Sequence, residues 1–416
     1  MTLDTIRMDG FWGSILAAES VRGCGAVLHG PGGCRITLSG VAAQSVVRGF
    51  GIREGPFYFN EPRVPCTYLD EDDYINGADY KLSDLLSTMD EDVAFVVQSP
   101  GTSLIGDDLN GAAYRSGFRG RVIIQEENHM SEPFHVGYDA TVSELVRGLC
   151  VPDHRERSKV VVLGIPVSMD GWEDTVEELG GYISAMGLEA VFPGAGCSVD
   201  DIAGSSDAVT CVTVLPEFCT RTSEAYRRLG IPTVFAETPV GFEGTATWIR
   251  SLAAAVGVNP EPALSILRRS SDRASSIMKG ALGGGLALRC ATYSMDVDST
   301  AALPLARWLY EYLAMFPTEI AVMPWWDSDF VDRFRGFLAE FRSEGALVDA
   351  LTPVKCDVVF AGGQAAALMR MNGVCSVDIA MQGPSTHQLR FVGRPFLGAK
   401  GALCMLDRMF ELCERD

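Results

Sequence analysis

Residues 158–168, SKVVVLGIPVS, decide the fold class of this chain, because an apolar and largely β-branched run ends there in a turn and leads into an amphipathic helix. In that helix Val176, Leu179, Ile183 and Met186 recur at helical spacing and lie on one face. A second apolar run, LEAVFPG (188–194), follows the helix. Strand, helix and strand in this order are typical of a βαβ unit on a parallel sheet.

The same pattern recurs in every third of the chain. In the first third, GAVLHGPGGC (25–34) precedes a helical stretch at 35–48. A second passage in this third consists of EDVAFVVQSPG (91–101), a helical stretch at 103–117 and RVIIQ (121–125). The middle third repeats it with DAVTCVTVL (207–215), a helix through 223–230 and IPTVFAE (231–237). The last third has LALRCATYS (286–294), then a helix with Leu305, Leu309, Tyr312 and Phe316 on one stripe, then EIAVMP (319–324). The repetition predicts an α/β protein with several parallel sheets.

Breaks in the pattern predict the domain limits. A charged stretch, VPDHRERSK (151–159), and a polar stretch that contains prolines, residues 259–276, separate the repeats. We expect three Rossmann-like, doubly wound domains at residues 1–155, 156–275 and 276–416, with parallel sheets around a central cleft. Ligands of such folds bind at the carboxyl ends of strands and in clefts between domains, so the turns after strands are the places to search.

Composition and charge restrict the function classes. The sequence is 47% hydrophobic and carries a formal net charge of −20. That charge repels nucleic-acid backbones and anionic membranes, so a protein is the expected macromolecular partner. The start, MTLDTIRMDG, lacks the basic and apolar regions of a signal peptide, and charges interrupt every apolar run well short of a membrane span. We therefore expect a cytoplasmic protein.

Twelve cysteines are scattered along the sequence, and none forms a CxxC pair. The spacing argues against a zinc knuckle and a thioredoxin-like motif. We expect most of these cysteines to be reduced and buried as small apolar side chains.

Cys34 is the exception, because it ends the motif HGPGGC (29–34) directly after a strand and at the start of a helix. Free N–H groups and the helix dipole favour a thiolate there, which suits a metal ligand. Gly32 and Gly33 allow the backbone to approach an inorganic ligand closely. A phosphate-type loop, or a plain turn around a buried thiol, fits the same residues, and the local sequence leaves these alternatives open.

Five landmarks in order along the chain resemble the nitrogenase component 1 family. They are HGPGGC (29–34), EPRVPCTYLDEDDYINGADYKL (61–82), VVQSPGTSLIGDDL (96–109), ETPVGFEGTATWIRSLAAAVG (237–257) and GRPFLGAKGALCMLDRMF (393–410). This family includes nitrogenase α and β subunits, cofactor-assembly scaffolds, light-independent protochlorophyllide and chlorophyllide reductases, and the cyclase of coenzyme F430 synthesis. Each landmark is short, but the ordered set spans nearly the whole chain.

The resemblance implies an oligomeric, iron–sulfur architecture. Three Rossmann-like domains surround a metal site, and two such chains pair in a dimer or heterotetramer. The partner is a homologous sister subunit or a second copy of the chain. A nitrogenase iron protein-like, ATP-dependent reductase delivers electrons to a cluster at the chain interface. The sequence has no Walker A motif, so we expect no ATP on this chain.

The resemblance assigns one cluster ligand directly, because Cys34 matches the cysteine of the family's HGPxGC motif. The two other family cysteines fall on Met8 or Asp9 and on Pro100, so they do not carry over. Asp9 is a candidate oxygen ligand, with Ser99 a weaker one.

Cys66 is a candidate replacement ligand. Alternatively, it is a buried thiol at the start of an acidic run, and the acids of that run cap a helix or lie on a solvated surface. Since a [4Fe–4S] cluster normally needs four protein ligands, Cys34 with Cys66 or Asp9 makes half of a site that a second chain completes.

Three further residues lie near family positions. Cys219 falls near the cysteine that holds the large nitrogenase cofactor, although the surrounding spacing differs. His387 falls near its histidine ligand, and its alternatives are a substrate contact or an ordinary loop histidine. His29 is expected to be a hydrogen-bonded core residue that orients its neighbours.

The resemblance favours an oxidoreductase subunit that accepts electrons through an interface iron–sulfur cluster and reduces a small molecule or a tetrapyrrole in the cleft. On this interpretation the chain is an enzyme only as part of a reductase complex. One alternative is a scaffold or carrier that assembles a metallocluster without turnover. Another is a degenerate structural subunit of a heteromeric complex whose sister chain carries the metal.

Overall fold

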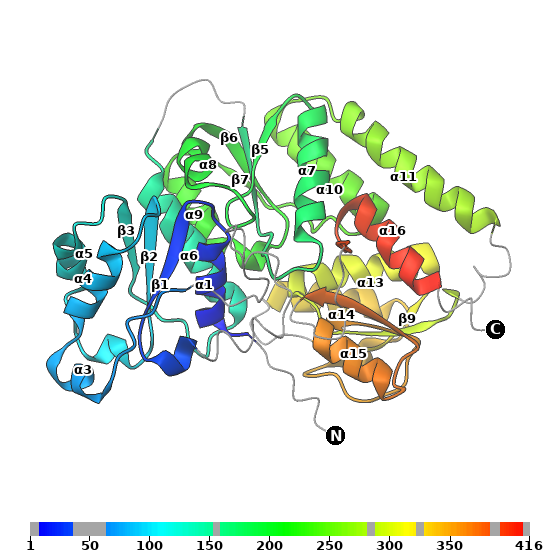
Figure 1. Ribbon diagram of the computed structural model, residues 1–416. Helices are drawn as coiled ribbons and strands as arrows, with labels where there is room; N and C mark the ends of the chain where they lie inside the picture. Colours follow the sequence, from blue (N-terminus) through cyan, green and yellow to red (C-terminus); the bar gives the residue numbers. More distant parts are fainter. Residues whose placement is uncertain are drawn as a thin grey trace.

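Three parallel sheets, each flanked by helices, make up the chain in this computed structural model (Figure 1). The structure describes residues 8–35, 64–152, 159–280, 288–321, 328–382 and 392–410. Strands pair in parallel in all three sheets. The predicted α/β class with parallel sheets is thereby confirmed.

The first unit contains a three-stranded sheet in the order β1-β2-β3. Its strands are β1 (Cys24–His29), β2 (Val93–Gln98) and β3 (Arg121–Gln125), and its helices are α1 (Gly10–Glu19), α3 (Glu71–Asn76), α4 (Asp79–Ser87), η1 (Thr102–Leu104), α5 (Leu109–Ser116) and α6 (Phe134–Leu149). Every residue of β1 and β2 is buried, since α4 and α5 cover one face of the sheet and α1 and α6 the other.

Helices α1 and α6 are in close contact through glycines. A Cβ atom at Gly137 would lie 1.8 Å from the carbonyl oxygen of Gly10, and one at Gly13 would lie 2.1 Å from that of Phe134. A side chain at either position would force the two helices apart. This contact holds α6 in place against the first sheet.

The second unit contains a four-stranded sheet in the order β5-β4-β6-β7. Its elements are β4 (Lys159–Leu163), α7 (Trp172–Ala185), β5 (Glu189–Val191), α8 (Val199–Gly204), η2 (Ser205–Asp207), β6 (Ala208–Thr213), η3 (Pro216–Phe218), α9 (Thr220–Arg228), β7 (Thr233–Val234) and α10 (Gly241–Val256). The strand and helix predicted from residues 158–186 are β4 and α7, and Leu179, Ile183 and Met186 are buried in the core.

The third unit contains a five-stranded sheet in the order β10-β9-β8-β11-β12. Its strands are β8 (Thr292–Met295), β9 (Phe316–Ala321), β10 (Leu347–Val348), β11 (Val358–Gly362) and β12 (Val377–Gln382), and the helices of this part of the chain are α11 (Glu261–Gly280), α13 (Ser299–Leu313), α14 (Ser328–Ala339), η4 (Glu344–Ala346), α15 (Gly363–Met371) and α16 (Gly398–Met409). One buried cluster joins this unit to the second through side chains such as Val160, Leu252, Leu305 and Met405.

Two local predictions in the last third are wrong. Phe316 does not continue the helical stripe: α13 ends at Leu313, Ala314 takes a left-handed conformation with φ 55°, and Phe316 begins β9. Because Pro317 follows, the backbone of Phe316 is driven away from the helical region. The strand predicted at 286–294 starts only at Thr292, since Leu288 ends a helix and Cys290 has a positive φ of 65°.

Helix α16 packs against the second and the third unit. It contacts α7, α10 and α11 (Figure 1), and Arg408 near its end donates to the backbone and carboxylate oxygens of Asp378 on β12. Glu178 of α7 accepts hydrogen bonds from the N–H groups of Ala399 and Lys400, which fixes the start of α16 there. Residues 411–416 lie outside the described residues.

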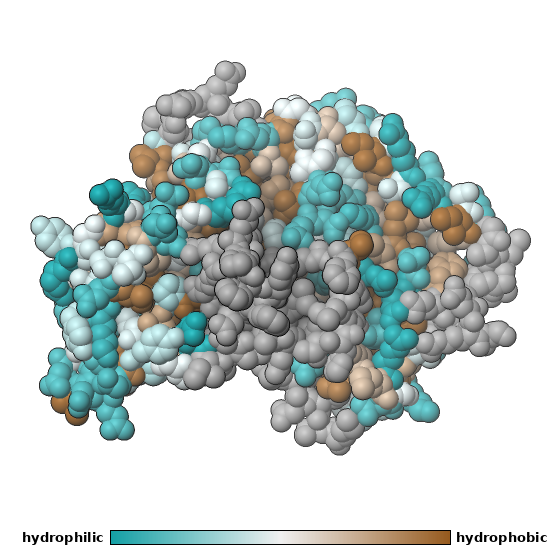
Figure 2. All heavy atoms as spheres, viewed as in Figure 1, coloured by the Kyte–Doolittle hydropathy of each residue, from teal (hydrophilic) through white to brown (hydrophobic). Residues whose placement is uncertain are grey.

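The domain limits stay a prediction. Strands of the three sheets lie within residues 24–125, 159–234 and 292–382. The expected limit at 155 falls outside the described residues, and the one at 275 falls inside α11. The visible described surface is largely hydrophilic (Figure 2). None of the described helices has the length and apolar character to cross a membrane.

Candidate functional site

The glycine loop after β1 brings two predicted ligand residues together. The segment 64–69 runs parallel to the end of β1, with hydrogen bonds from Leu28 N–H to Pro65 O (2.8 Å) and from Thr67 N–H to Leu28 O (3.1 Å). This alignment brings Cys66 beside the loop, where its thiol donates to the carbonyl oxygen of Gly30 at 3.4 Å. Cys34 lies in the helical residues 32–35 that follow the loop.

Both thiols are less acidic than ordinary cysteines. Burial raises the pKa of Cys34, and burial, followed by the nearby charge of Cys34, raises the pKa of Cys66. Burial acts against the thiolate that we expected at the helix start, so the protonation state of Cys34 stays a prediction. A metal ion that binds here has to displace the thiol protons.

The glycines of the loop differ in the space around them. A Cβ atom at Gly30 would lie 2.8 Å from Ser99 Cβ, and one at Gly32 would lie 2.9 Å from the ring of Tyr68. At Gly33 a Cβ atom would meet no atom of the described residues within 4 Å. Among the described residues, the loop is therefore least crowded at Gly33, next to Cys34.

His29 supports the loop through hydrogen bonds of its buried side chain, as predicted for a hydrogen-bonded core residue. Its side chain is buried, with Nε2 3.0 Å from Asp107 Oδ2 and Nδ1 3.2 Å from the hydroxyl of Thr67. Burial lowers the pKa of His29, although Asp107 opposes this shift. The landmarks HGPGGC and IGDDL are therefore in direct contact.

The remaining ligand candidates of the first unit make hydrogen bonds within the chain, and their assignment as ligands stays a prediction. Asp9 is the N-cap of α1: its carboxylate accepts from Trp12 N–H at 3.3 Å and from Ser131 N–H at 3.4 Å. Ser99 is buried and hydrogen-bonded to the hydroxyl of Thr102. The acidic run after Cys66 caps α3 through a reciprocal Asp70–Asp73 capping box.

Within the described ranges, no three His, Cys, Asp or Glu side chains lie close enough to hold a metal ion. Cys34 and Cys66 lie near each other, and their assignment as half of a cluster site stays a prediction. Most of the cysteines that the structure describes are buried.

Of the two residues near the family's cofactor ligands, the structure describes Cys219 but not His387. Cys219 is buried at the end of η3, where its thiol donates to the carbonyl oxygens of Leu215 (3.6 Å) and Pro216 (3.5 Å), and burial raises its pKa strongly. It does not line the cavity described next. His387 lies outside the described residues.

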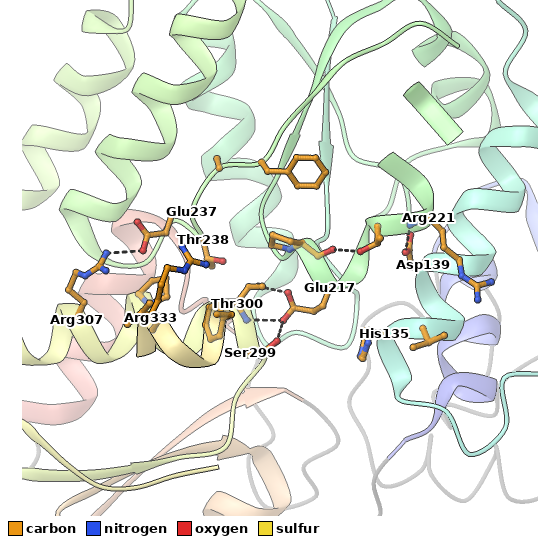
Figure 3. A pocket seen from close by; sticks show the side chains of 18 residues that line it. His135, Asp139, Glu217, Arg221, Glu237, Thr238, Ser299, Thr300, Arg307 and Arg333 are labelled. Carbon is orange, nitrogen blue, oxygen red and sulfur yellow. Dashed lines mark hydrogen bonds and ion pairs between the residues drawn. The ribbon is translucent and has the colours of Figure 1, made fainter. Parts of the chain in front are cut away.

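A cavity of about 800 Å³ lies where the three units meet (Figure 3). The first unit contributes α6, the second contributes η3, the start of α9 and the residues after β7, and the third contributes α13 and α14. Apolar side chains form much of the wall: Val136, Pro216, Phe235, Ala236, Leu303, Pro304 and Phe330. The other lining residues are polar or charged, so the cavity combines apolar surface with many polar groups, and a cavity of this size can take a small molecule.

Two buried carboxylates in the cavity wall connect the units. Asp139 of α6 accepts from the N–H groups of Arg221 (2.6 Å) and Thr222 (2.9 Å) at the start of α9. Glu217 of η3 accepts from Thr300 N–H (3.2 Å) and from the hydroxyl groups of Thr300 and Ser299 at the start of α13. Each carboxylate thus caps a helix that belongs to the next unit.

Burial sets the protonation of the cavity wall. It raises the pKa of Asp139 and Glu217, while their hydrogen bonds oppose the shift. It lowers the pKa of His135 to about 4, so this imidazole is neutral at pH 7. Arg221 forms an ion pair with Glu127 at 2.9 Å.

The sequence analysis did not single out these cavity residues. Glu217, Thr238 and Ser299 all follow the carboxyl ends of strands, of β6, β7 and β8, which is where ligands of parallel sheets bind. That rule was the signal that could have found them. Asp139 was detectable as the charged residue within the otherwise uncharged run 137–143 of α6.

These features define a class of protein: three parallel-sheet α/β units with a cavity at their junction and a cysteine-bearing glycine loop on the first sheet. Residues 10–283, more than half of the 416 residues, match the family of nitrogenase component 1 type oxidoreductases, and the chain belongs to this family. The resemblance inferred from the five landmarks is confirmed.

Curated relatives are subunits of light-independent protochlorophyllide reductases. Subunit N of Rhodopseudomonas palustris strain TIE-1 is 28% identical over 282 residues, which cover 64% of this chain and 62% of that protein. Subunit N of Halorhodospira halophila is 28% identical over 312 residues, 71% of this chain and 70% of that protein. A different subunit of such a reductase, from Chloroflexus aggregans, is 24% identical over 95% of this chain and 73% of that protein. The first of these matches thus spans less than two thirds of the relative's length.

Solved structures share the fold. Nitrogenase Cp1 at pH 6.5 matches 99% of this chain and 94% of its own with a TM-score of 0.80 and 14% identity. Nitrogenase Cp1 at pH 5 matches with a TM-score of 0.67. At this identity the likeness concerns the fold alone.

Proposed function

We propose that this chain is a subunit of a nitrogenase-like reductase that reduces a tetrapyrrole held in the cavity between its three units. The cavity carries the proposal, because its volume of about 800 Å³ and its apolar wall suit a large flat molecule. The names of the curated relatives, which are subunits of protochlorophyllide reductases, support the substrate class.

Cys34 and Cys66 are proposed to hold one side of an interface [4Fe–4S] cluster, and a sister subunit or a second copy supplies the other ligands. Their support is the pair of neighbouring thiols beside the glycine loop. Such a cluster supplies low-potential electron transfer when bound. An ATP-dependent iron–sulfur reductase is the proposed electron donor.

The residues of this chain bind and orient the substrate in this proposal. The apolar part of the wall contacts the body of the substrate, and neutral His135 adds no charge to the wall at pH 7. Asp139 and Glu217 keep the three walls in fixed relation by capping helices across the junction. The substrate is thus held by side chains from all three units.

Iron and acid-labile sulfide per chain, measured after anaerobic co-purification with the sister subunit, test the cluster ligands. The variants are Cys34→Ser, Cys66→Ser and, as a control, Cys290→Ser, which changes an exposed thiol away from the loop. We expect both loop variants to lose the cluster and the control to retain it. Full cluster content in both loop variants would contradict the ligand assignment.

Turnover with the ATP-dependent reductase tests the activity itself. We expect the complex to reduce protochlorophyllide in the presence of ATP. A complex that binds the cluster but reduces no tetrapyrrole, and instead transfers the cluster to another protein, would support the scaffold alternative.

A further inference from the structure

The two ends of the cavity differ in their charged groups. Figure 3 shows His135, Asp139 and Arg221 at one end and Arg307, Arg333, Glu237 and Thr238 at the other. Asp139 accepts a hydrogen bond from the backbone N–H of Thr222 at the start of α9, and Arg221 pairs with Glu127. The charges at the first end therefore already have partners within the chain.

At the second end, Arg307 and Glu237 neutralise each other. The guanidinium of Arg307 on α13 lies 2.9 Å from Glu237 Oε1, and both side chains are partly exposed. A negative group of a ligand that enters this end meets a balanced pair instead of a bare carboxylate, so Glu237 contributes little repulsion.

Arg333 adds a positive charge at this end. It lies on α14 and lines the cavity, with its guanidinium 5.7 Å from the centre of the Phe330 ring. No carboxylate among the described residues pairs with Arg333. A guanidinium over an aromatic ring is held in place while its N–H donors stay available to an anion.

Thr238 is an independent sign of a ligand at the same end. It lines the cavity and is 2% exposed, and its hydroxyl has no hydrogen-bond partner within the described part of the chain. A buried hydroxyl without a partner is unfavourable, so its hydrogen-bonding capacity is available to a bound molecule.

We propose that Arg333 and the hydroxyl of Thr238 bind a carboxylate group of the ligand, while the apolar wall takes its body. The class of ligand is an apolar, flat molecule with a free carboxylate side chain. Guanidinium groups pair well with carboxylates, and a hydroxyl donates to the same group. If the ligand is the tetrapyrrole of the proposed function, this inference rests on that function. Arg333 then binds the propionate side chain of the tetrapyrrole.

Binding of two matched pairs of probes to the purified chain tests this inference. The pairs are protochlorophyllide with its methyl ester, and the fluorescent carboxylate pyrenebutyrate with its methyl ester. The variants are Arg333→Met and the control Arg335→Met, which changes an arginine of the same helix that pairs with Asp332 and does not line the cavity. Arg333→Lys keeps the charge without the planar guanidinium.

We expect each acid to bind wild type about tenfold more tightly than its ester, as for a hydrogen bond to a charged group. Arg333→Met should remove this preference, Arg333→Lys should keep part of it, and Arg335→Met should leave it unchanged. If the chain prefers pyrenebutyrate to its methyl ester but binds neither tetrapyrrole, the carboxylate site is supported and the proposed substrate is refuted. Equal binding of acid and ester, a preference that survives Arg333→Met, or failure of both pairs to bind would overturn the carboxylate site.

Discussion

Oε1 of Glu217 accepts a hydrogen bond from the backbone N–H of Thr300 at 3.2 Å, and this bond joins the second unit to the third. The same carboxylate accepts from the hydroxyl groups of Thr300 and Ser299. A side chain from η3 thus completes the first turn of α13, a helix whose own N-cap, Asp298, makes no side-chain cap bond.

Glu217→Ala should loosen the start of α13, because it leaves a buried N–H group and two hydroxyls without their acceptor. We expect local stability to fall by about 2 kcal/mol, the usual cost of an unsatisfied buried group. Hydrogen–deuterium exchange of the first turn of α13 measures this loss. Glu243→Ala, at an exposed ion pair with Arg250, is the control and should exchange like wild type. Unchanged protection in Glu217→Ala would show that the cap contributes nothing.

Asp139→Asn should change how stability depends on pH. Burial raises the pKa of Asp139, so the folded state binds the proton more tightly than the unfolded state. The stabilisation is therefore complete below the unfolded pKa and is lost as the pH rises through the folded pKa. Between about pH 4 and pH 7, the asparagine variant should lose less stability with rising pH than wild type does. Urea titrations of both proteins give the two slopes, and parallel slopes would contradict the raised pKa.

His135→Phe should have the opposite effect on the pH profile. Burial lowers the pKa of His135 from 6.5 to about 4. As the pH falls, His135 is protonated in the unfolded state at a higher pH than in the folded state. The stability that neutral His135 contributes is therefore fully present above the unfolded pKa and is lost as the pH falls through the folded pKa. From pH 6.5 to 4, the shift is worth at most about 3.4 kcal/mol, at about 1.36 kcal/mol per pKa unit. Urea titration at several pH values should show a shallower acid loss in the variant; an identical loss would exclude His135 as its source.

Alkylation of the metal-free chain tests the acidity of the loop thiols. Iodoacetamide reacts with thiolates, and burial raises the pKa of Cys34 and Cys66. We expect exposed Cys290 to be labelled before either of them at neutral pH. Mass spectrometry of partly labelled peptides gives the order. Fastest labelling at Cys34 would instead support the dipole-activated thiolate that its position at the helix start suggested.

Much of the fold could be predicted from local sequence patterns. The apolar run at 159–163 and the stripe of Leu179 and Ile183 predicted β4 and α7, because both depend on periodicity within a few residues. Phe316 was misassigned although Pro317 carried the signal that ends the helix.

Less of the site could be predicted, since its groups come from distant parts of the chain. HGPGGC pointed to Cys34, but the pKa of that thiol depends on burial by segments that no local motif reveals. The pairing of Glu217 with Thr300 joins residues 83 positions apart, and that of Asp139 with Thr222 joins residues equally far apart. A single sequence contains no periodicity that predicts such contacts.

The position of α16 sets an order in which the protein can fold during synthesis. Residues 398–409 cover apolar surface of α7, α10 and α11, helices made much earlier by the ribosome. Until α16 emerges, the second unit keeps that surface uncovered, and Glu178 lacks the two N–H groups of Ala399 and Lys400. The nascent chain must therefore hold an incomplete middle unit, exposed to chaperones and to aggregation, while the whole third sheet is translated.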